Sequence, residues 1–193
     1  MSTASTPPLL IGLTGRAGAG KDTVAGYLED AYGCAPIALA DPILDMLGAL
    51  IQHVDVDGAW LIERDLKEQP RPVLLASYRQ LARAIGDALR AIDADFWVRI
   101  AAHHTGQLLA MGNNVCLTDV RYPNEAQELA AMGGVLVCIE RPAHELPSVQ
   151  PHSSESHTDS LAVQHTLINN GSRATLEDQI DRLMEQLLRE PRS

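Results

Sequence analysis

A short segment near the N-terminus has the residue types and the spacing of a loop that binds phosphate. It runs from Gly15 to Lys21 and fits the pattern G-x-x-x-x-G-K, with the intervening residues Arg16, Ala17, Gly18, Ala19 and Gly20. Glycines let the backbone curl so that several N–H groups point into one concavity. The lysine adds a mobile cation for the β and γ phosphates. A chance glycine-rich turn is the alternative, and the flanking sequence decides between the two.

The flanking segments have the patterns of a strand and a helix, as this motif requires. Residues 9–14 form an apolar run that predicts a buried strand. Residues 21–32 carry apolar side chains at helical spacing, and Gly33 follows as a candidate C-cap. The positive end of that helix would lie under the loop and favour an anion there. This context favours the phosphate site.

The residue after the lysine departs from the usual pattern, which has Ser or Thr there to contact Mg²⁺. Here Asp22 follows Lys21, and Thr23 comes next. A carboxylate binds the same hard cation directly or through water, although an acid in a first helical turn also complements the helix dipole. We expect Mg²⁺ at this end of the loop with Asp22 as its ligand, and contact through Thr23 is the alternative.

Three arginines lie on one face of a helix predicted over residues 77–92. Arg83 and Arg90 follow Arg79 at i+4 and i+11, which places all three on the same side. Asp87 can neutralise only part of their charge. Guanidinium groups grip phosphate oxygens bidentately, so this face predicts a second phosphate; a solvated basic face is the alternative. A separate apolar stripe, expected to pack on the core, consists of Leu81, Ile85, Leu89 and Ile92.

Charged residues also stand where predicted strands end. Asp119 comes at the end of an apolar strand that begins at residue 115, a position suited to an acid that serves Mg²⁺ or the acceptor. Arg121 would reach into the same crevice. Arg141 ends the next strand, where an arginine could close over the transferring phosphoryl group; an ordinary surface residue is an equal alternative.

Two further groups of residues have structural interpretations beside functional ones. His144, His152 and His157 lie in a polar, proline-containing segment, and their spacing matches no metal motif. We interpret them as polar flap residues that contact a ligand, not as a zinc site. Trp97, next to Phe96, is either a core anchor or a wall on which a base stacks, and the core is favoured.

Strand and helix patterns alternate along the chain. Strands are predicted over residues 9–14, 37–40, 115–120, 135–140 and 165–169, and helices over residues 21–32, 41–51, 77–92, 94–104, 124–132 and 175–188. Asp41 is the expected N-cap of the second helix, before Pro42, and Thr175 that of the last. This alternation predicts an α/β fold with a parallel sheet covered on both faces. Ligands then belong at the carboxyl ends of the strands.

Composition restricts the partners. The formal net charge of −10 over 193 residues argues against a nucleic-acid polymer, which needs a surplus of Lys and Arg. The three cysteines, Cys34, Cys116 and Cys138, include no C-x-x-C pair, so neither disulfides nor a zinc site are expected, and a reducing cytoplasm fits. Cys116 and Cys138 lie in apolar runs that predict strands, and we expect both to be small core residues. No apolar stretch is long enough to span a bilayer, so no membrane contact is expected.

One domain is expected over residues 1–193, because no repeat, low-complexity tract or linker interrupts the sequence. Residues 1–8 read as a disordered tail. Residues 53–72 and 142–160 are expected to form a mobile insert and a flap.

Several of these segments together resemble the deoxynucleoside monophosphate kinases of bacteriophage type, over nearly the whole chain. They are, in order, Gly15-x4-Gly20-Lys21-Asp22-Thr23, Ala40-Asp41-Pro42, Arg79 to Arg90 leading into Asp95-Phe96-Trp97, Asp119-Val120-Arg121-Tyr122-Pro123-Asn124-Glu125, and Glu140-Arg141-Pro142 before His152-x-Ser154-Glu155. The resemblance implies an adenylate-kinase-like P-loop fold, a three-layer sandwich with about five parallel strands. It also implies ATP and Mg²⁺ as cofactors and deoxynucleoside monophosphates as acceptors. In this family an aspartate at the position of Asp22 is usual. The resemblance also implies that Asp41 and the arginines bind the acceptor, and that the loop from Asn170 to Arg173 holds adenine.

Two other functions stay open. Dephospho-CoA kinase shares the fold, but its acceptor is a hydroxyl that needs a proton acceptor, for which Asp41 or Asp119 could serve. A P-loop ATPase or nucleotide-sensing module would only hydrolyse or bind ATP; against it, Val120 stands where a catalytic glutamate is common, and no Asn-Lys-x-Asp motif is present. The accepted bases, the choice of sugar, and a monomer or a homodimer are left open.

Overall fold

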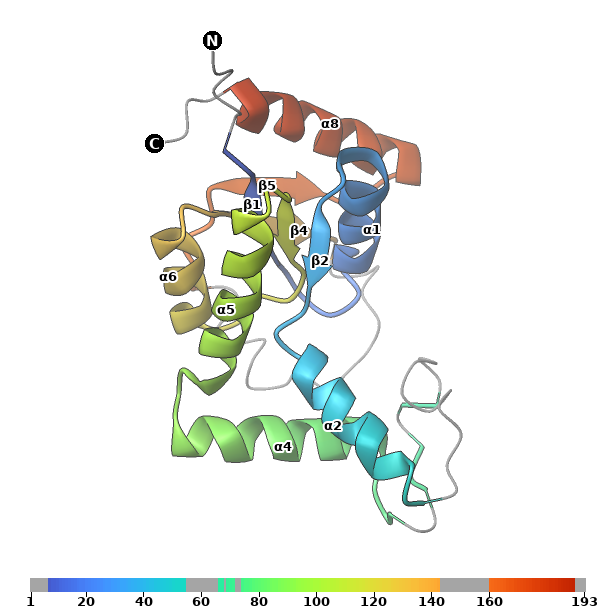
Figure 1. The fold of residues 1–193 in the computed structure, drawn as a ribbon. Helices are drawn as coiled ribbons and strands as arrows, with labels where there is room; N and C mark the ends of the chain where they lie inside the picture. The colour runs from blue at the N-terminus through green and yellow to red at the C-terminus, as the bar shows by residue number, and fades with distance from the viewer. Residues whose placement is uncertain (1–6, 55–65, 68, 72–73, 143–159, 190–193) are drawn as a thin grey trace. The chain divides into compact units, whose positions relative to one another are not determined.

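The computed structural model describes residues 7–54, 66–67, 69–71, 74–142 and 160–189. Its sheet has five strands in the order β2-β3-β1-β4-β5, and every neighbouring pair is parallel (Figure 1). The strands are β1 (Leu10–Thr14), β2 (Ala35–Ile37), β3 (Val115–Leu117), β4 (Val135–Glu140) and β5 (His165–Ile168). The helices are α1 (Lys21–Tyr32), α2 (Asp41–Ile51), α4 (Tyr78–Ile92), α5 (Phe96–Ala110), α6 (Pro123–Ala131) and α8 (Arg173–Arg189). The predicted five-stranded parallel sheet is confirmed.

The chain forms two compact units. The first contains Met1–Ala38 and Ile100–Ser193, and therefore the whole sheet; the second is Leu39–Arg99. The single domain stays a prediction. The predicted tail, insert and flap fall largely outside the described residues, so they also remain predictions.

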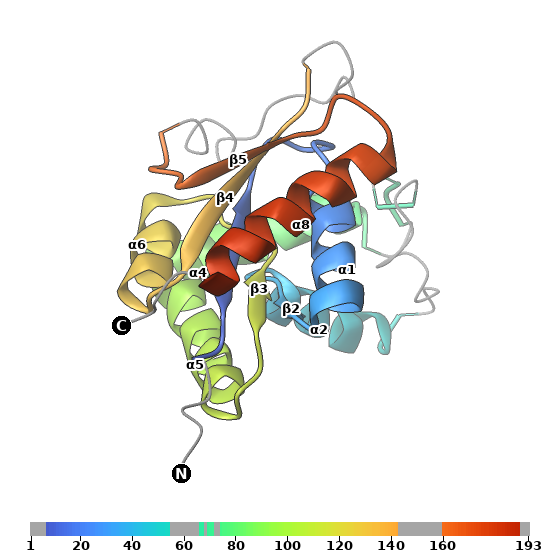
Figure 2. The same ribbon diagram turned by 90° about the horizontal axis from the view of Figure 1, so that it is seen from above.

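Helices of the first unit cover both faces of its sheet. Ile11 and Leu13 of β1 are fully buried in a core shared with the apolar sides of α1 and α8, which lie side by side in Figure 2. Gly12, between them, faces the other way: a Cβ on it would lie 2.5 Å from Cδ2 of Leu129 on α6. Because side chains alternate along a strand, this sequence builds the expected three layers. The apolar face predicted for the last helix is confirmed, with Leu176, Ile180, Leu183 and Leu187 all buried.

Two strands have other bounds than predicted: β2 starts and ends earlier, and β3 ends earlier. The second strand is β2, over Ala35–Ile37, and not residues 37–40. The predicted bounds were wrong for a local reason. The Ala40 carbonyl accepts from the amides of Ile43 and Leu44, so Ala40 belongs to the start of α2 and not to a strand. The third strand, β3, ends at Leu117, although the Val120 N–H still donates to the Leu13 carbonyl at 3.0 Å.

Two predicted helix caps are displaced. Ala40 is the N-cap of α2, so Asp41 is its first helical residue rather than its cap. Thr175 lies inside α8, and its N–H donates to the Ser172 hydroxyl at 3.2 Å. α2 nevertheless spans the predicted residues, Asp41–Ile51, whereas α8 begins at Arg173, two residues before the predicted start.

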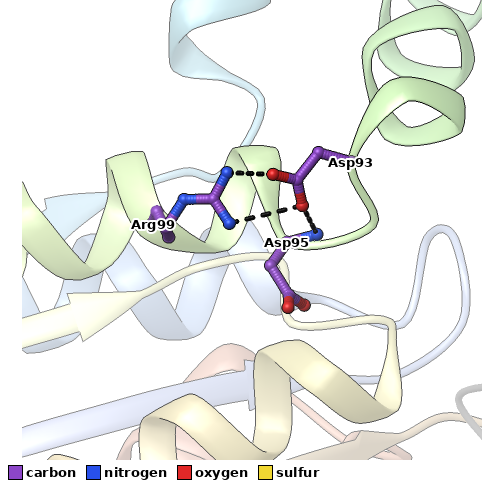
Figure 3. A network of polar contacts seen from close by, with 3 residues as sticks. All are labelled: Asp93, Asp95 and Arg99. Atoms are coloured by element: carbon purple, nitrogen blue, oxygen red, sulfur yellow. Dashed lines mark hydrogen bonds and ion pairs between the residues drawn. The ribbon is translucent and has the colours of Figure 1, made fainter.

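The second unit contains α2, α4 and the start of α5. Ser77 caps α4, accepting from the Gln80 N–H at 3.3 Å in a reciprocal capping box. At the other end Asp93 accepts from the Asp95 N–H at 2.9 Å and pairs with Arg99, which lowers the pKa of the Asp93 carboxyl (Figure 3). This exposed pair joins α4 to α5.

The apolar stripe predicted on α4 is only partly covered. Ile92, the last residue of α4, is 80 % exposed, so its expected packing on the core is wrong. Leu81, Ile85 and Leu89 are half-buried.

Candidate nucleotide-phosphate site

The segment from Gly15 to Gly20 joins β1 to α1 as an open loop with the backbone of a phosphate cradle. Gly15, Gly18 and Gly20 have φ angles of 138°, 78° and 108°, which residues with a side chain rarely adopt. A Cβ on Gly15 would collide with the Ile139 carbonyl oxygen. Position 15 therefore requires glycine for two reasons: its backbone angle and the close approach of the Ile139 carbonyl.

Lys21 lies across this loop. Its Nζ donates to the carbonyl of Gly15 at 2.8 Å and to that of Arg16 at 3.1 Å. Inside the loop the Ala19 N–H donates to the Arg16 carbonyl at 3.1 Å. The ammonium thus stands at the N-terminus of α1, where backbone dipole and cation both favour an anion.

Asp22 and Thr23 occupy the first turn of α1, and both are exposed. Their hard oxygen donors fit Mg²⁺, which keeps several waters and takes only one or two protein ligands beside phosphate oxygens. Asp119 follows β3, which pairs with β1 on one side, and it is half-buried. Among the described residues, no three His, Cys, Asp or Glu side chains gather to hold a metal on their own. The oxygen donors of Asp22, Thr23 and Asp119 are of the chemical kind that Mg²⁺ takes.

Glu125 shapes the turn that carries Asp119 and Arg121, a role that the sequence analysis did not assign. It is only 5 % exposed, and its Oε2 accepts from the Arg121 N–H at 2.6 Å and from the Tyr122 N–H at 3.0 Å. A proline at position 123 followed by Glu125 is a recognisable helix start, so this signal was present. The Arg121 side chain is exposed.

Arg141 follows β4, and its guanidinium reaches the loop. Its Nη1 lies 3.4 Å from the Gly18 carbonyl, and the side chain is exposed. Of the two interpretations of this residue, its position favours the functional one.

The end of β5 contacts the loop through a residue that the sequence analysis missed. Asn169 donates from Nδ2 to the Ala19 carbonyl at 2.8 Å. Asn170, next to it, is exposed. Arg173 is the first residue of α8 and pairs with Glu177 at 2.7 Å, a hydrogen bond that raises the pKa of Arg173. The segment predicted to hold adenine therefore begins directly beside the phosphate loop.

The predicted acceptor residues belong mostly to the second unit. Arg79, Arg83 and Arg90 all lie on α4; Arg83 is exposed and the other two are half-buried. Asp41, at the start of α2, is exposed. That these side chains meet the phosphate loop stays a prediction.

Trp97 is a core residue. It is 2 % exposed, its Nε1 donates to the Gly86 carbonyl at 3.0 Å, and its ring meets Phe96 edge to face at 4.9 Å. A ring that is buried and has its polar atom already bonded offers no surface for stacking, so the favoured interpretation of Trp97 as a core anchor is confirmed, and the alternative, a wall of the acceptor site on which a base stacks, is wrong. His144, His152 and His157 lie outside the described residues.

No family profile matches this sequence, but individual relatives do. An uncharacterized protein, ORF77, of Ictalurid herpesvirus 1 is 30 % identical over 172 residues, which cover 88 % of this chain and 68 % of that protein. A protein of Acanthamoeba polyphaga mimivirus named "Putative deoxynucleotide monophosphate kinase" is 30 % identical over 181 residues, covering 84 % of this chain and 89 % of that protein.

Solved kinase structures share the fold. A sugar kinase from Janibacter sp. superimposes with a TM-score of 0.52 at 14 % identity over 96 % of this chain and 97 % of its own. A dephospho-CoA kinase from Campylobacter jejuni gives 0.50 at 13 % identity over 94 % and 98 %. The described part of this chain contains no helix that is long and apolar enough to cross a bilayer. The fold is that of the P-loop kinases, and the chain belongs to the same family as the mimivirus deoxynucleotide monophosphate kinase-like protein.

Proposed function

We propose that this protein transfers the terminal phosphoryl group of ATP to a deoxynucleoside monophosphate. The observation that carries the proposal is the position of Lys21, with its ammonium 2.8 Å and 3.1 Å from two carbonyls of a glycine loop at the start of α1. A cation held over such a loop is what a nucleotide triphosphate requires. The similarity to the mimivirus protein named as a putative deoxynucleotide monophosphate kinase supports the choice of acceptor.

On the donor side the loop amides and Lys21 would hold the β and γ phosphates, with Lys21 exchanging the Gly15 and Arg16 carbonyls for phosphate oxygens. Asp22, Thr23 and Asp119 supply the oxygen atoms for Mg²⁺, which when bound neutralises phosphate charge. Arg141, already beside the Gly18 carbonyl, would move a short way onto the transferring group.

On the acceptor side Arg79, Arg83, Arg90 and Arg121 would hold the monophosphate. Its phosphate is already an anion near neutral pH, so no strong general base is needed. What must be overcome is the repulsion between two polyanions, and the guanidinium groups together with Lys21 reduce it.

The test is a coupled assay of ADP release with ATP and each of the deoxynucleoside monophosphates, the ribonucleoside monophosphates, dephospho-CoA, or no acceptor. We expect release that depends on a deoxynucleoside monophosphate. Release without any acceptor would instead identify an ATPase, and release only with dephospho-CoA would identify a kinase of a hydroxyl acceptor.

Lys21→Ala should lower transfer at least about 100-fold, since it removes a charge that acts on the transition state, with an unchanged unfolding midpoint. Arg182→Ala, which removes an exposed cation from α8, is the matched control and should be as active as the natural protein. Full activity of Lys21→Ala would defeat the mechanism.

A further inference from the structure

The side-chain amide of Asn169 connects the last strand of the sheet to the phosphate loop. Its backbone N–H donates to the Glu140 carbonyl at 2.7 Å, which continues the ladder between β4 and β5. Its Nδ2 donates to the Ala19 carbonyl at 2.8 Å, across 150 positions of sequence. The same nitrogen would lie 2.5 Å from a Cβ placed on Gly20. The amide therefore packs directly on the peptide between Ala19 and Gly20.

Gln179 of α8 holds the residue before Asn169. Its Oε1 accepts from the Ile168 N–H at 2.9 Å, and its Nε2 donates to the Ile168 carbonyl at 2.9 Å. Nε2 also reaches the Thr175 carbonyl at 3.3 Å. A side-chain amide that meets both polar groups of one residue replaces a neighbouring strand. The end of β5 is thus fixed at the point where Asn169 begins.

Fixing the Ala19 carbonyl also fixes the direction of the next amide. The peptide group is planar and trans, so the Ala19 C=O and the Gly20 N–H point to opposite sides. Glycine offers many orientations of this peptide, and Gly20 has no side chain to restrict it. The N–H groups of such a loop are the groups that bind phosphate. A donor on one side of the peptide thereby orients an anion-binding group on the other.

We propose that Asn169 is a positioning residue for the phosphate loop and that Gln179 holds Asn169 in place. The inference rests on the proposed function of that loop, and the ligand concerned is the polyphosphate chain of a nucleotide. Asn169 acts on it through the Ala19–Gly20 peptide and not by contact with the base.

The direct test compares binding of magnesium tripolyphosphate, which has no base, with binding of MgATP by titration calorimetry. Asn169→Ala should weaken both about tenfold, the effect of one lost hydrogen bond of average strength or slightly more. Gln179→Ala should weaken both about threefold, and the double variant should bind no more weakly than Asn169→Ala, because the two residues act in series.

Gln164→Ala is the matched control. Gln164 also uses a side-chain amide at the edge of the sheet, accepting from the Leu136 N–H at 2.8 Å, but it precedes β5 instead of following it. Its removal should change neither affinity by more than about twofold.

Asn169→Asp separates positioning from a general structural role. It keeps the shape of the side chain but places a carboxylate oxygen against the Ala19 carbonyl. At pH 8 tripolyphosphate should bind more weakly than to Asn169→Ala. Its affinity relative to the natural protein should recover as the pH falls towards about 5, because a protonated carboxyl group is a donor again and the contact raises its pKa.

Kinetics provide a second readout. Asn169→Ala should raise KM for ATP and lower kcat, while KM for the deoxynucleoside monophosphate stays unchanged. A loss of affinity for ATP without a loss for tripolyphosphate would assign Asn169 to the base and overturn the inference, as would an unchanged affinity for both. If the natural protein binds both ligands but phosphorylates no acceptor, the proposed function fails, whereas the binding series still decides the role of Asn169.

Discussion

Replacing Gly20 with alanine should destabilise the protein, and the structure gives the size of the effect. Gly20 has φ 108°, and a residue with a Cβ costs about 1–2 kcal/mol in the left-handed region. The new Cβ would also displace the Asn169 amide, 2.5 Å away, and so remove its hydrogen bond to Ala19, about 1 kcal/mol. The alanine restricts the unfolded chain and returns about 0.5 kcal/mol. The net loss is about 2 kcal/mol.

Gly26 supplies a control with the same chemical change. It lies inside α1, and a Cβ on it would meet no atom within 4 Å. Alanine there should raise stability by about 0.5–1 kcal/mol, because glycine is a poor residue in a helix interior. The two substitutions, on one helix and its N-cap, should thus have opposite signs.

Urea unfolding followed by circular dichroism measures both. With a slope of about 2 kcal/mol per molar urea, the midpoint of Gly20→Ala should fall by about 1 M and that of Gly26→Ala should rise by about 0.3–0.5 M. A Gly20→Ala midpoint equal to or above that of the natural protein would refute the account of the loop given above.

Three further outcomes are expected. Leu129→Ala should cost about 2–5 kcal/mol of unfolding free energy, measured in urea, because the side chain is 1 % exposed and leaves a cavity beside Gly12. Burial, followed by its hydrogen bond to Asp181, raises the pKa of Tyr32 to about 12; Asp181→Asn should lower that pKa in a tyrosinate absorbance titration while burial keeps it above 10. Since the neutral phenol is favoured by folding, this stabilisation is present below pH 10 and is lost between about pH 10 and 12. Burial likewise raises the pKa of the Cys34 thiol to about 11, so a thiol reagent at pH 8 should label it only after unfolding, and its contribution to stability should disappear between about pH 9 and 11.

The parts of the fold that sequence pattern predicted are those with local causes. The loop and α1 are recognisable because glycines, Lys21 and helical spacing all lie within one short segment, and α1 has the predicted bounds. The error over residues 37–40 also has a local origin, since an apolar run does not show whether its last residues continue a strand or cap a helix.

Long-range contacts could not be predicted in this way. The hydrogen bond from Asn169 to Ala19 spans 150 positions of sequence, and no sequence pattern in or next to β5 indicates a partner in the phosphate loop. Glu125 lay within reach as a helix-start signal, but its bonds to two backbone amides depend on how the turn after β3 folds. For Trp97 the sequence allowed two interpretations, a core anchor or a stacking surface. Only its burial and its hydrogen bond to Gly86 in the folded structure decide between them.

The two edges of the sheet carry different features that hinder pairing with another strand. At β5 the Gln179 amide occupies the outward N–H and C=O of Ile168. At β2 the Ala35 N–H and the Ile37 C=O bond towards β3, so the residue between them, Pro36, faces outward and has no N–H to offer. Each feature hinders a strand of a second chain from pairing at that position, and edge features of this kind reduce edge-to-edge aggregation. A second chain that pairs at these positions would have to displace the Gln179 amide or pair without an N–H from Pro36.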